Sequence, residues 1–170
     1  MRTLTLIAAF LVLAGCNGKD KEKKEPELKT VYYSHTDFSM GADLSYVNQI
    51  LDHGGVYRDS GTVKDPYVIF KKYGANTVRL RLWHNPDWTR TVYNPPAANM
   101  YNDFGDVKRA ITAAKSLGMA VSLDFHYSDI WADPAHQEPP VAWEGLSLEL
   151  LRDSIYNYTL KTLDRLESAS

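Results

Sequence analysis

The chain has 170 residues, of which 44% are hydrophobic, 24% charged and 12% aromatic. This composition is typical of a folded globular domain and excludes a disordered chain, a collagen and a polytopic membrane protein. The 19 basic and 21 acidic residues give a net charge of -2, so no basic excess is present to bind nucleic acid. The only cysteine, Cys16, excludes an intramolecular disulfide and a multi-cysteine metal site.

Residues 1–15 have the pattern of an export signal. Arg2 precedes an apolar run over residues 4–13, which is too short for a bilayer-spanning helix of about 20 residues. Residues 13–16 (Leu-Ala-Gly-Cys) resemble a bacterial lipobox, which implies cleavage before Cys16 and a lipid on that cysteine. The alternative is a plain secretory signal with an incidental cysteine. We expect a lipoprotein signal peptide, Sec export and a membrane anchor at Cys16 in the bacterial cell envelope, at the outer membrane or cell surface.

The next segment, residues 16–30, is dense in charges of both signs. Residues 19–25 (Lys-Asp-Lys-Glu-Lys-Lys-Glu) offer no apolar face to bury, so we expect a lipidated, solvated tether. The folded part is then residues 31–170.

Three short runs in the folded part alternate in the manner of β-strands, over residues 38–43, 76–83 and 119–126. Helical patterns separate them. Asp65 is a suitable N-cap, with Pro66 at the first helical position and Gly74 at the end. Further helices begin at Asp103 and Ser147, a short helical turn covers residues 44–51, and residues 85–102 and 127–145 are predicted as loops. The expected buried residues of the helix at Asp65 are Val68, Ile69 and Tyr73.

Strands separated by helices predict parallel pairing with right-handed crossovers, in either an open sheet or a barrel. Each strand has one apolar face and one face of small or charged residues, whereas the strands of a two-sided open sheet are apolar on both faces. The strands repeat every 40 residues or so, and the excess length follows the strands, where barrel active sites lie. The sequence therefore predicts an α/β fold, a (β/α)8 TIM barrel of which this chain holds the first three βα units.

Polar residues on the inward faces are expected to meet at the mouth of this barrel: Asp43, Arg79, Arg81, Asp124 and His126. A buried ion pair between Arg79 and Asp124 is the alternative for those two residues, and a core histidine is the alternative for His126. All four tryptophans, Trp83, Trp88, Trp131 and Trp143, lie at or after the ends of the second and third strands. Aromatic faces stack on sugar rings while carboxylates bind hydroxyls, so a carbohydrate cleft is favoured over ordinary loop packing.

No cofactor is identifiable in the sequence. His126, Asp129, Asp133 and His136 carry metal-ligating groups but form no recognised helical pair, so no metal site is predicted. Glycine-rich phosphate loops and a serine nucleophile elbow are also absent from the sequence.

The three strand motifs together resemble glycoside hydrolase family 53, the arabinogalactan endo-β-1,4-galactanases. The motifs are residues 38–43 (Phe-Ser-Met-Gly-Ala-Asp), residues 76–83 (Asn-Thr-Val-Arg-Leu-Arg-Leu-Trp) and residues 123–134, which include Leu-Asp-Phe-His-Tyr-Ser-Asp and Trp-Ala-Asp-Pro. The resemblance covers about residues 36–146. It implies a (β/α)8 barrel that cleaves β-1,4-galactan, a pectin side chain, with retention through two glutamates about 5–5.5 Å apart.

The family places those glutamates at the ends of the fourth and seventh strands, so we expect both beyond Ser170 and expect this chain to be an inactive N-terminal fragment. The resemblance carries over only substrate-binding residues: Asp43, Arg79, Arg81, His126, Tyr127, Ser128, Asp129, Trp131 and Asp133. It implies galactan or arabinogalactan as the partner and allows structural calcium, and we expect a monomer at full length. The alternatives are a non-catalytic carbohydrate-binding surface lipoprotein and a retaining barrel glycosidase of another specificity.

Overall fold

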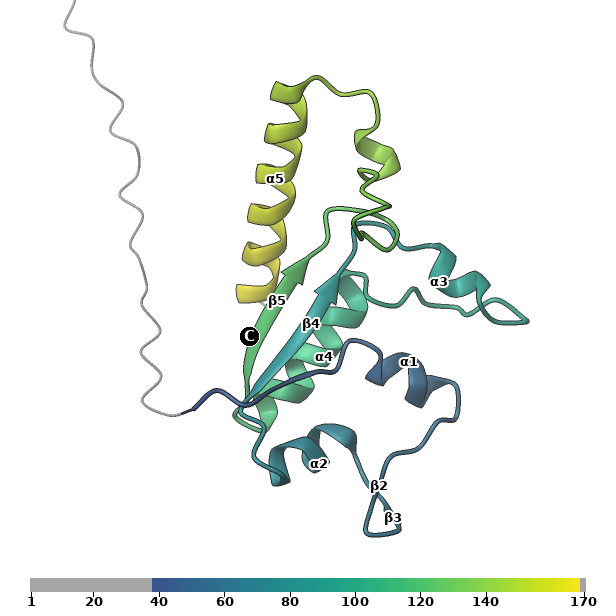
Figure 1. The fold of residues 1–170 in the computed structure, drawn as a ribbon, viewed down its shortest axis with the longest axis vertical. Coiled ribbons are helices and arrows are strands. Elements are labelled where there is room, and N and C mark those ends of the chain that lie inside the picture. The colour runs from purple at the N-terminus through teal and green to yellow at the C-terminus, as the bar shows by residue number, and fades with distance from the viewer. Residues whose placement is uncertain (1–37, 169–170) are drawn as a thin grey trace, which may run out of the picture. The chain divides into compact units, whose positions relative to one another are not determined.

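A computed structural model describes residues 38–168 of the chain (Figure 1). The expected signal peptide, the tether and Cys16 lie outside the described residues. Strands β1 (Gly41–Asp43), β4 (Thr77–Leu82) and β5 (Ala120–Phe125) form one parallel sheet in the order β1-β4-β5. All three predicted strands are thereby confirmed, with β1 three residues shorter than its predicted range.

The predicted helices begin where their caps indicated. Asp65 accepts a hydrogen bond from the amide of Val68 and caps α2 (Pro66–Lys72), and Asp103 caps α4 (Phe104–Ser116) in the same way. Ser147 caps α5 (Leu148–Glu167), and the short turn before them is α1 (Val47–Asp52). Short polar side chains at these positions satisfy backbone amides that have no partner within the helix.

Four short elements were not predicted from the sequence. Strands β2 (Arg58–Asp59) and β3 (Thr62–Val63) form a small antiparallel hairpin, while α3 (Trp88–Thr91) and the 3-10 turn η1 (Val141–Trp143) lie within the two predicted loops. Elements of two to four residues carry too little periodicity for a sequence pattern to register.

The hydrophobic core lies between β4 and α4. Val78, Leu80 and Leu82 of β4 are fully buried, and α4 packs against both β4 and β5. The residues of α4 that join this core are Val107, Ala110 and Ala114. The apolar faces of β4 and β5 therefore meet α4, as a barrel requires, and their opposite faces carry the polar residues. Of the apolar residues predicted for the first strand, only Ala42 packs against the core, while Phe38 and Met40 are exposed.

The buried face predicted for α2 is wrong. Val68 and Tyr73 are exposed and Ile69 is half-buried, and the helix instead buries Pro66 and Tyr67. Tyr73 is drawn away from the core because its hydroxyl donates a 2.8 Å hydrogen bond to Asp59 on the β2–β3 hairpin. A helix of seven residues makes only two turns, so one such contact decides which face is buried. Within residues 38–168, no helix is long and apolar enough to cross a membrane.

Candidate functional site at the carboxyl ends of the strands

The register of the parallel sheet brings the predicted polar residues side by side. Asp43 is paired with Arg79 across β1 and β4, and Arg81 is paired with Asp124 across β4 and β5. The Arg79 guanidinium forms ion pairs with both Asp43 and Asp124, one through each terminal nitrogen. The ion pair considered as an alternative for Arg79 and Asp124 is therefore present, at a partly exposed position that three strands share.

Asp43 is held in its ionised form. Partial burial favours the neutral acid, but the Ser45 hydroxyl at 2.5 Å, the Ser45 amide at 3.0 Å and the Arg79 guanidinium outweigh it and lower the pKa of Asp43 below its usual value. The Ser45 hydroxyl also accepts the Arg81 amide at 2.9 Å. Sequence reasoning missed Ser45, although its position two residues after a strand-end aspartate is that of an Asx turn.

His126 stands at the end of β5 as a neutral imidazole. Its Nε2 lies 3.0 Å from Oδ2 of Asp124, and burial lowers the pKa of His126 against the opposing effect of that carboxylate. The Asp124 carboxylate favours the tautomer that carries the proton on Nε2. Nδ1 is then an acceptor; it is buried and has no hydrogen-bond partner among the described residues.

Arg81 lies in an aromatic cage. Its guanidinium carbon is 4.0 Å from the centre of the Trp131 ring and 5.3 Å from the rings of Tyr46 and Trp83. Its side chain is 7% exposed, and its nearest carboxylate oxygen, on Asp43, is 3.8 Å from Nη2. Nε and Nη1 are buried without a hydrogen-bond acceptor in the described chain.

A hollow of about 440 Å³ opens beside this cage. The residues that line it are Trp88, Ile130, Trp131, Asp133 and His136. Both indoles contact Trp83 edge to face, with ring centres 5.4 Å apart in each case, and Trp83 is fully buried. The hollow is therefore an apolar surface whose two walls rest on one buried aromatic ring, with Asp133 and His136 at its polar side.

Asp133 and His136 form an exposed pair. The carboxylate oxygens of Asp133 lie 3.0 and 3.1 Å from Nδ1 of His136, which lowers the pKa of Asp133 and raises the pKa of His136. The sequence predicted Asp133 as a substrate-binding residue, and the structure places it with Trp131 in one hollow.

The remaining three predicted residues connect the loops and do not face the hollow. The Asp129 carboxylate accepts the backbone amides of Asn85 at 2.8 Å and Val141 at 3.0 Å, while its carbonyl accepts the Trp88 indole at 2.9 Å. Buried Ser128 donates to the Glu138 carbonyl at 2.9 Å, and the Tyr127 hydroxyl lies 2.8 Å from that of Thr159 on α5. A substrate-binding role for these three residues, as for the other six, stays a prediction.

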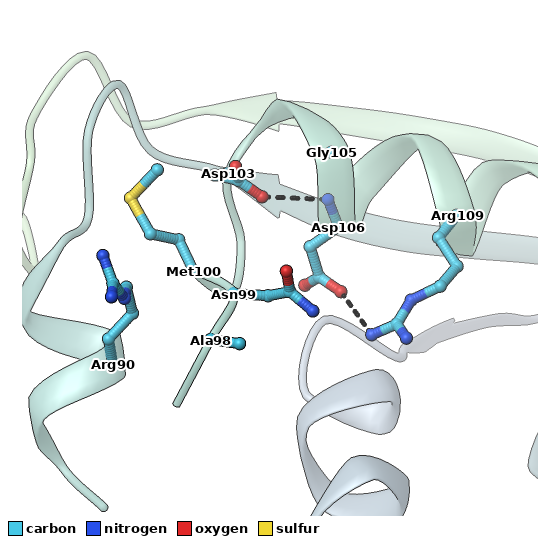
Figure 2. A pocket seen from close by; sticks show the side chains of 8 residues that line it. All are labelled: Arg90, Ala98, Asn99, Met100, Asp103, Gly105, Asp106 and Arg109. Carbon is cyan, nitrogen blue, oxygen red and sulfur yellow. Dashed lines mark hydrogen bonds and ion pairs between the residues drawn. The ribbon is translucent and has the colours of Figure 1, made fainter. Parts of the chain in front are cut away.

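A second hollow of about 440 Å³ lies between α3 and the first turn of α4, away from the predicted residues (Figure 2). Its charged groups are largely paired with one another: Asp103 accepts the Asp106 amide at 2.9 Å, and Asp106 contacts Arg109 at 3.2 Å. Across residues 38–168, no group of three metal-ligating side chains is assembled.

The chain matches known proteins along most of its folded part. The model of glycosyl hydrolase family 53 matches residues 39–170. An arabinogalactan endo-beta-1,4-galactanase of Cellvibrio japonicus is 43% identical over 134 residues, covering 78% of this chain and 33% of that relative. An endo-beta-1,4-galactanase of Bacillus subtilis is 36% identical over 177 residues, covering 94% and 40%.

Two solved structures also match this chain. A chain from a study of two fungal beta-1,4-galactanases matches with a TM-score of 0.66 at 35% identity, over 76% of this chain and 36% of that one. The catalytic domain of an Ignisphaera aggregans family 53 protein matches with a TM-score of 0.68 at 36% identity, over 78% and 36%. The chain spans about a third of the length of these proteins.

Fold and site together define a segment of a (β/α)8-barrel glycoside hydrolase, in which three parallel strands carry charged residues to the mouth and tryptophans line the adjacent loops. The chain belongs to glycosyl hydrolase family 53. The expected fold class is thereby confirmed.

Proposed function

We propose that the natural protein carrying residues 39–170, hereafter the whole protein, is an endo-acting β-1,4-galactanase that retains the anomeric configuration. Its reaction uses two glutamates, an acid/base and a nucleophile, which we place beyond Ser170. The chain described here then supplies one wall of the substrate cleft and no catalytic carboxylate.

The observation that carries this proposal is the hollow between Trp88 and Trp131, which shares Trp131 with the cage around Arg81. Indole faces bind the C–H side of a sugar ring, and Asp133 and His136 at the rim offer an acceptor and a donor to its hydroxyls. The named galactanases among the relatives supply the sugar class.

Within this proposal the charged mouth orients the reacting sugar. The family resemblance implies that the catalytic glutamates lie close to Arg79 and His126. Arg79 is fixed between Asp43 and Asp124, and His126 is neutral. A fixed guanidinium favours an ionised carboxylate near it, which is the form that a nucleophile needs.

A substrate screen tests the proposal. We expect the whole protein to release reducing ends from β-1,4-galactan and not from mannan, xylan or cellulose. Turnover on one of the other polysaccharides would favour a barrel glycosidase of another specificity. Galactan affinity by calorimetry without released reducing ends would favour a non-catalytic binding lipoprotein.

We also propose that Cys16 carries a lipid and anchors the protein in the bacterial cell envelope after Sec export. The support is the order of Arg2, the apolar residues 4–13 and Leu-Ala-Gly before the only cysteine. Metabolic labelling with a fatty acid tests this: wild-type protein is expected to take up the label, and a Cys16→Ser variant is not. Equal labelling of both forms would overturn it.

A further inference from the structure

Arg81 is a buried cation without a conventional set of hydrogen-bond partners. Its side chain is 7% exposed, yet Nε and Nη1 have no acceptor in the described chain and Nη2 is 3.8 Å from the nearest carboxylate oxygen. Buried arginines ordinarily satisfy their five N–H donors with carboxylates or carbonyls. What surrounds Arg81 instead is the cage of Tyr46, Trp83 and Trp131.

The neighbouring arginine takes the carboxylates that lie nearest to Arg81. Arg79, two residues earlier on the same face of β4, takes both Asp43 and Asp124 as partners. Those two carboxylates are thereby engaged, and Asp43 is further held by Ser45. Arg81 is left with aromatic faces, which attract a guanidinium through the negative charge of their π-clouds.

The shortest of the three contacts is to Trp131. The guanidinium carbon lies 4.0 Å from that ring centre, against 5.3 Å for each of the other two rings. Trp131 also lines the hollow with Trp88, and none of the cage residues Arg81, Tyr46 and Trp83 lines it. One side of the Trp131 indole therefore contacts the cage, and another side faces the hollow. In agreement with this, 43% of the residue is exposed.

We propose that Arg81 is a positioning residue that fixes Trp131 as the stacking surface for a neutral hexosyl unit of the polysaccharide. This inference rests on the proposed function and adds the residue that prepares its site. Arg81 contacts the indole and does not contact the sugar. Because the ring is held before substrate arrives, its ordering on binding is avoided, which strengthens binding.

A double-mutant cycle in the whole protein tests the inference, with β-1,4-galactotriose as the probe and calorimetry as the readout. Trp131→Ala is expected to raise the Kd about tenfold, and Arg81→Met to raise it three- to tenfold with kcat changed less than KM. The double variant Arg81→Met/Trp131→Ala is expected to bind no more weakly than Trp131→Ala alone, because Arg81 acts through the indole. Arg81→Lys, which keeps the charge and loses the planar stack, is expected to rescue binding only in part.

Arg152→Met is the matched control, since it removes the same charge from an exposed position on α5. It is expected to leave the Kd unchanged. A fluorescence measurement keeps the test valid if Arg81→Met is less stable: quenching of Trp131 by iodide is expected to rise in this variant at a temperature where circular dichroism shows it folded.

The outcomes separate the two proposals. If Trp131→Ala leaves galactotriose binding unchanged, the sugar-binding role proposed for the hollow fails. If Trp131→Ala weakens binding and Arg81→Met does not, the proposed function stands and the inference about Arg81 is wrong. Fully additive effects in the cycle would also overturn it, because they would mean that Arg81 contacts the ligand itself.

Discussion

Two clusters of buried polar groups in this chain are built in opposite ways. Asp59, on the β2–β3 hairpin, has a side chain that is 1% exposed, and its carboxylate contacts Lys64 at 2.7 Å, Lys72 at 2.5 Å and the Tyr73 hydroxyl at 2.8 Å. At the mouth of the strands, Arg81, Trp83 and His126 each leave a buried nitrogen without a hydrogen-bond partner among the described residues.

The difference separates a structural cluster from a candidate site. The Asp59 cluster satisfies its polar atoms within the chain, which is what buried polar groups do when their role is to hold a fold together. A buried polar atom without a partner costs free energy, and proteins keep such atoms where something else has to contact them. The mouth of the strands is thus one part of the described chain where a ligand or a neighbouring barrel segment is to be expected.

We expect the largest effect on activity from removing Arg79, the central charge at the mouth of the strands. Arg79→Met leaves Asp43 and Asp124 without their shared cation, and we expect a loss of about 1 kcal/mol of folding free energy, because both ion pairs are partly exposed to solvent. In the whole protein, kcat/KM on galactan is expected to fall a hundredfold or more, because the inward residues lose their fixed geometry. Initial-rate assays and thermal melts measure both effects; a variant with wild-type kcat/KM would remove Arg79 from the site.

Removing the stacking surface is expected to have an intermediate effect. Trp131→Ala in the whole protein should raise KM for short galactan oligosaccharides about tenfold with a smaller change in kcat, since the stack forms in both the ground and transition states. Trp131→Phe keeps an aromatic face and is the conservative control. Equal kinetics for the alanine and phenylalanine variants would contradict a stacking role.

Disrupting the Asp59 cluster should change stability without changing the site. Asp59→Asn is expected to lower the melting temperature of the whole protein by several degrees and to leave kcat/KM on galactan unchanged. Hydrogen bonds from Lys64, Lys72 and Tyr73 lower the pKa of Asp59 well below its ordinary value of 3.8. Its stabilisation is therefore fully present above pH 3.8 and is lost as the pH falls through the lower, folded-state pKa.

The difference in melting temperature between wild type and Asp59→Asn should accordingly narrow as the pH falls below 3.8. A gap that stayed constant down to the acid limit of folding would mean that the Asp59 charge does not stabilise the hairpin. A large loss of activity in Asp59→Asn at neutral pH would contradict the separation between the two clusters.

The smallest effect is expected from the titration of His136 at the rim of the hollow, measured as a change in galactotriose binding. Asp133 raises the pKa of His136 above 6.5, so the contribution of the charged pair is present below that pH and is lost as the pH rises through the folded-state pKa. Galactotriose binding is expected to weaken about twofold over this rise, a small effect because the pair is exposed. His136→Gln should abolish the pH dependence, and calorimetry at three pH values measures it.

Sequence patterns predicted the parts of the fold that rest on local chemistry. The alternation of Val78, Leu80 and Leu82 with Arg79 and Arg81 defined β4 and its two faces, and the caps at Asp65, Asp103 and Ser147 marked the helix starts. These features depend on a few neighbouring residues, so one sequence is enough to read them.

The features that were missed or misassigned depend on distant contacts. The exposed position of Tyr73 follows from a hydrogen bond to Asp59, fourteen residues away. The cage around Arg81 joins Tyr46, Trp83 and Trp131, which are adjacent only because β1, β4 and β5 are parallel. The loop-connecting contacts of Asp129 likewise require both strand-end loops to be in place.

A crystal structure of the whole protein with bound β-1,4-galactotriose would show whether the hollow beside Trp131 holds the sugar. We expect a galactosyl ring stacked on Trp131, with hydroxyls in contact with Asp133 or His136, and the chain of sugars continuing toward Arg79 and His126. A trisaccharide bound with none of these residues in contact, in a crystal where the hollow is open to solvent, would contradict it.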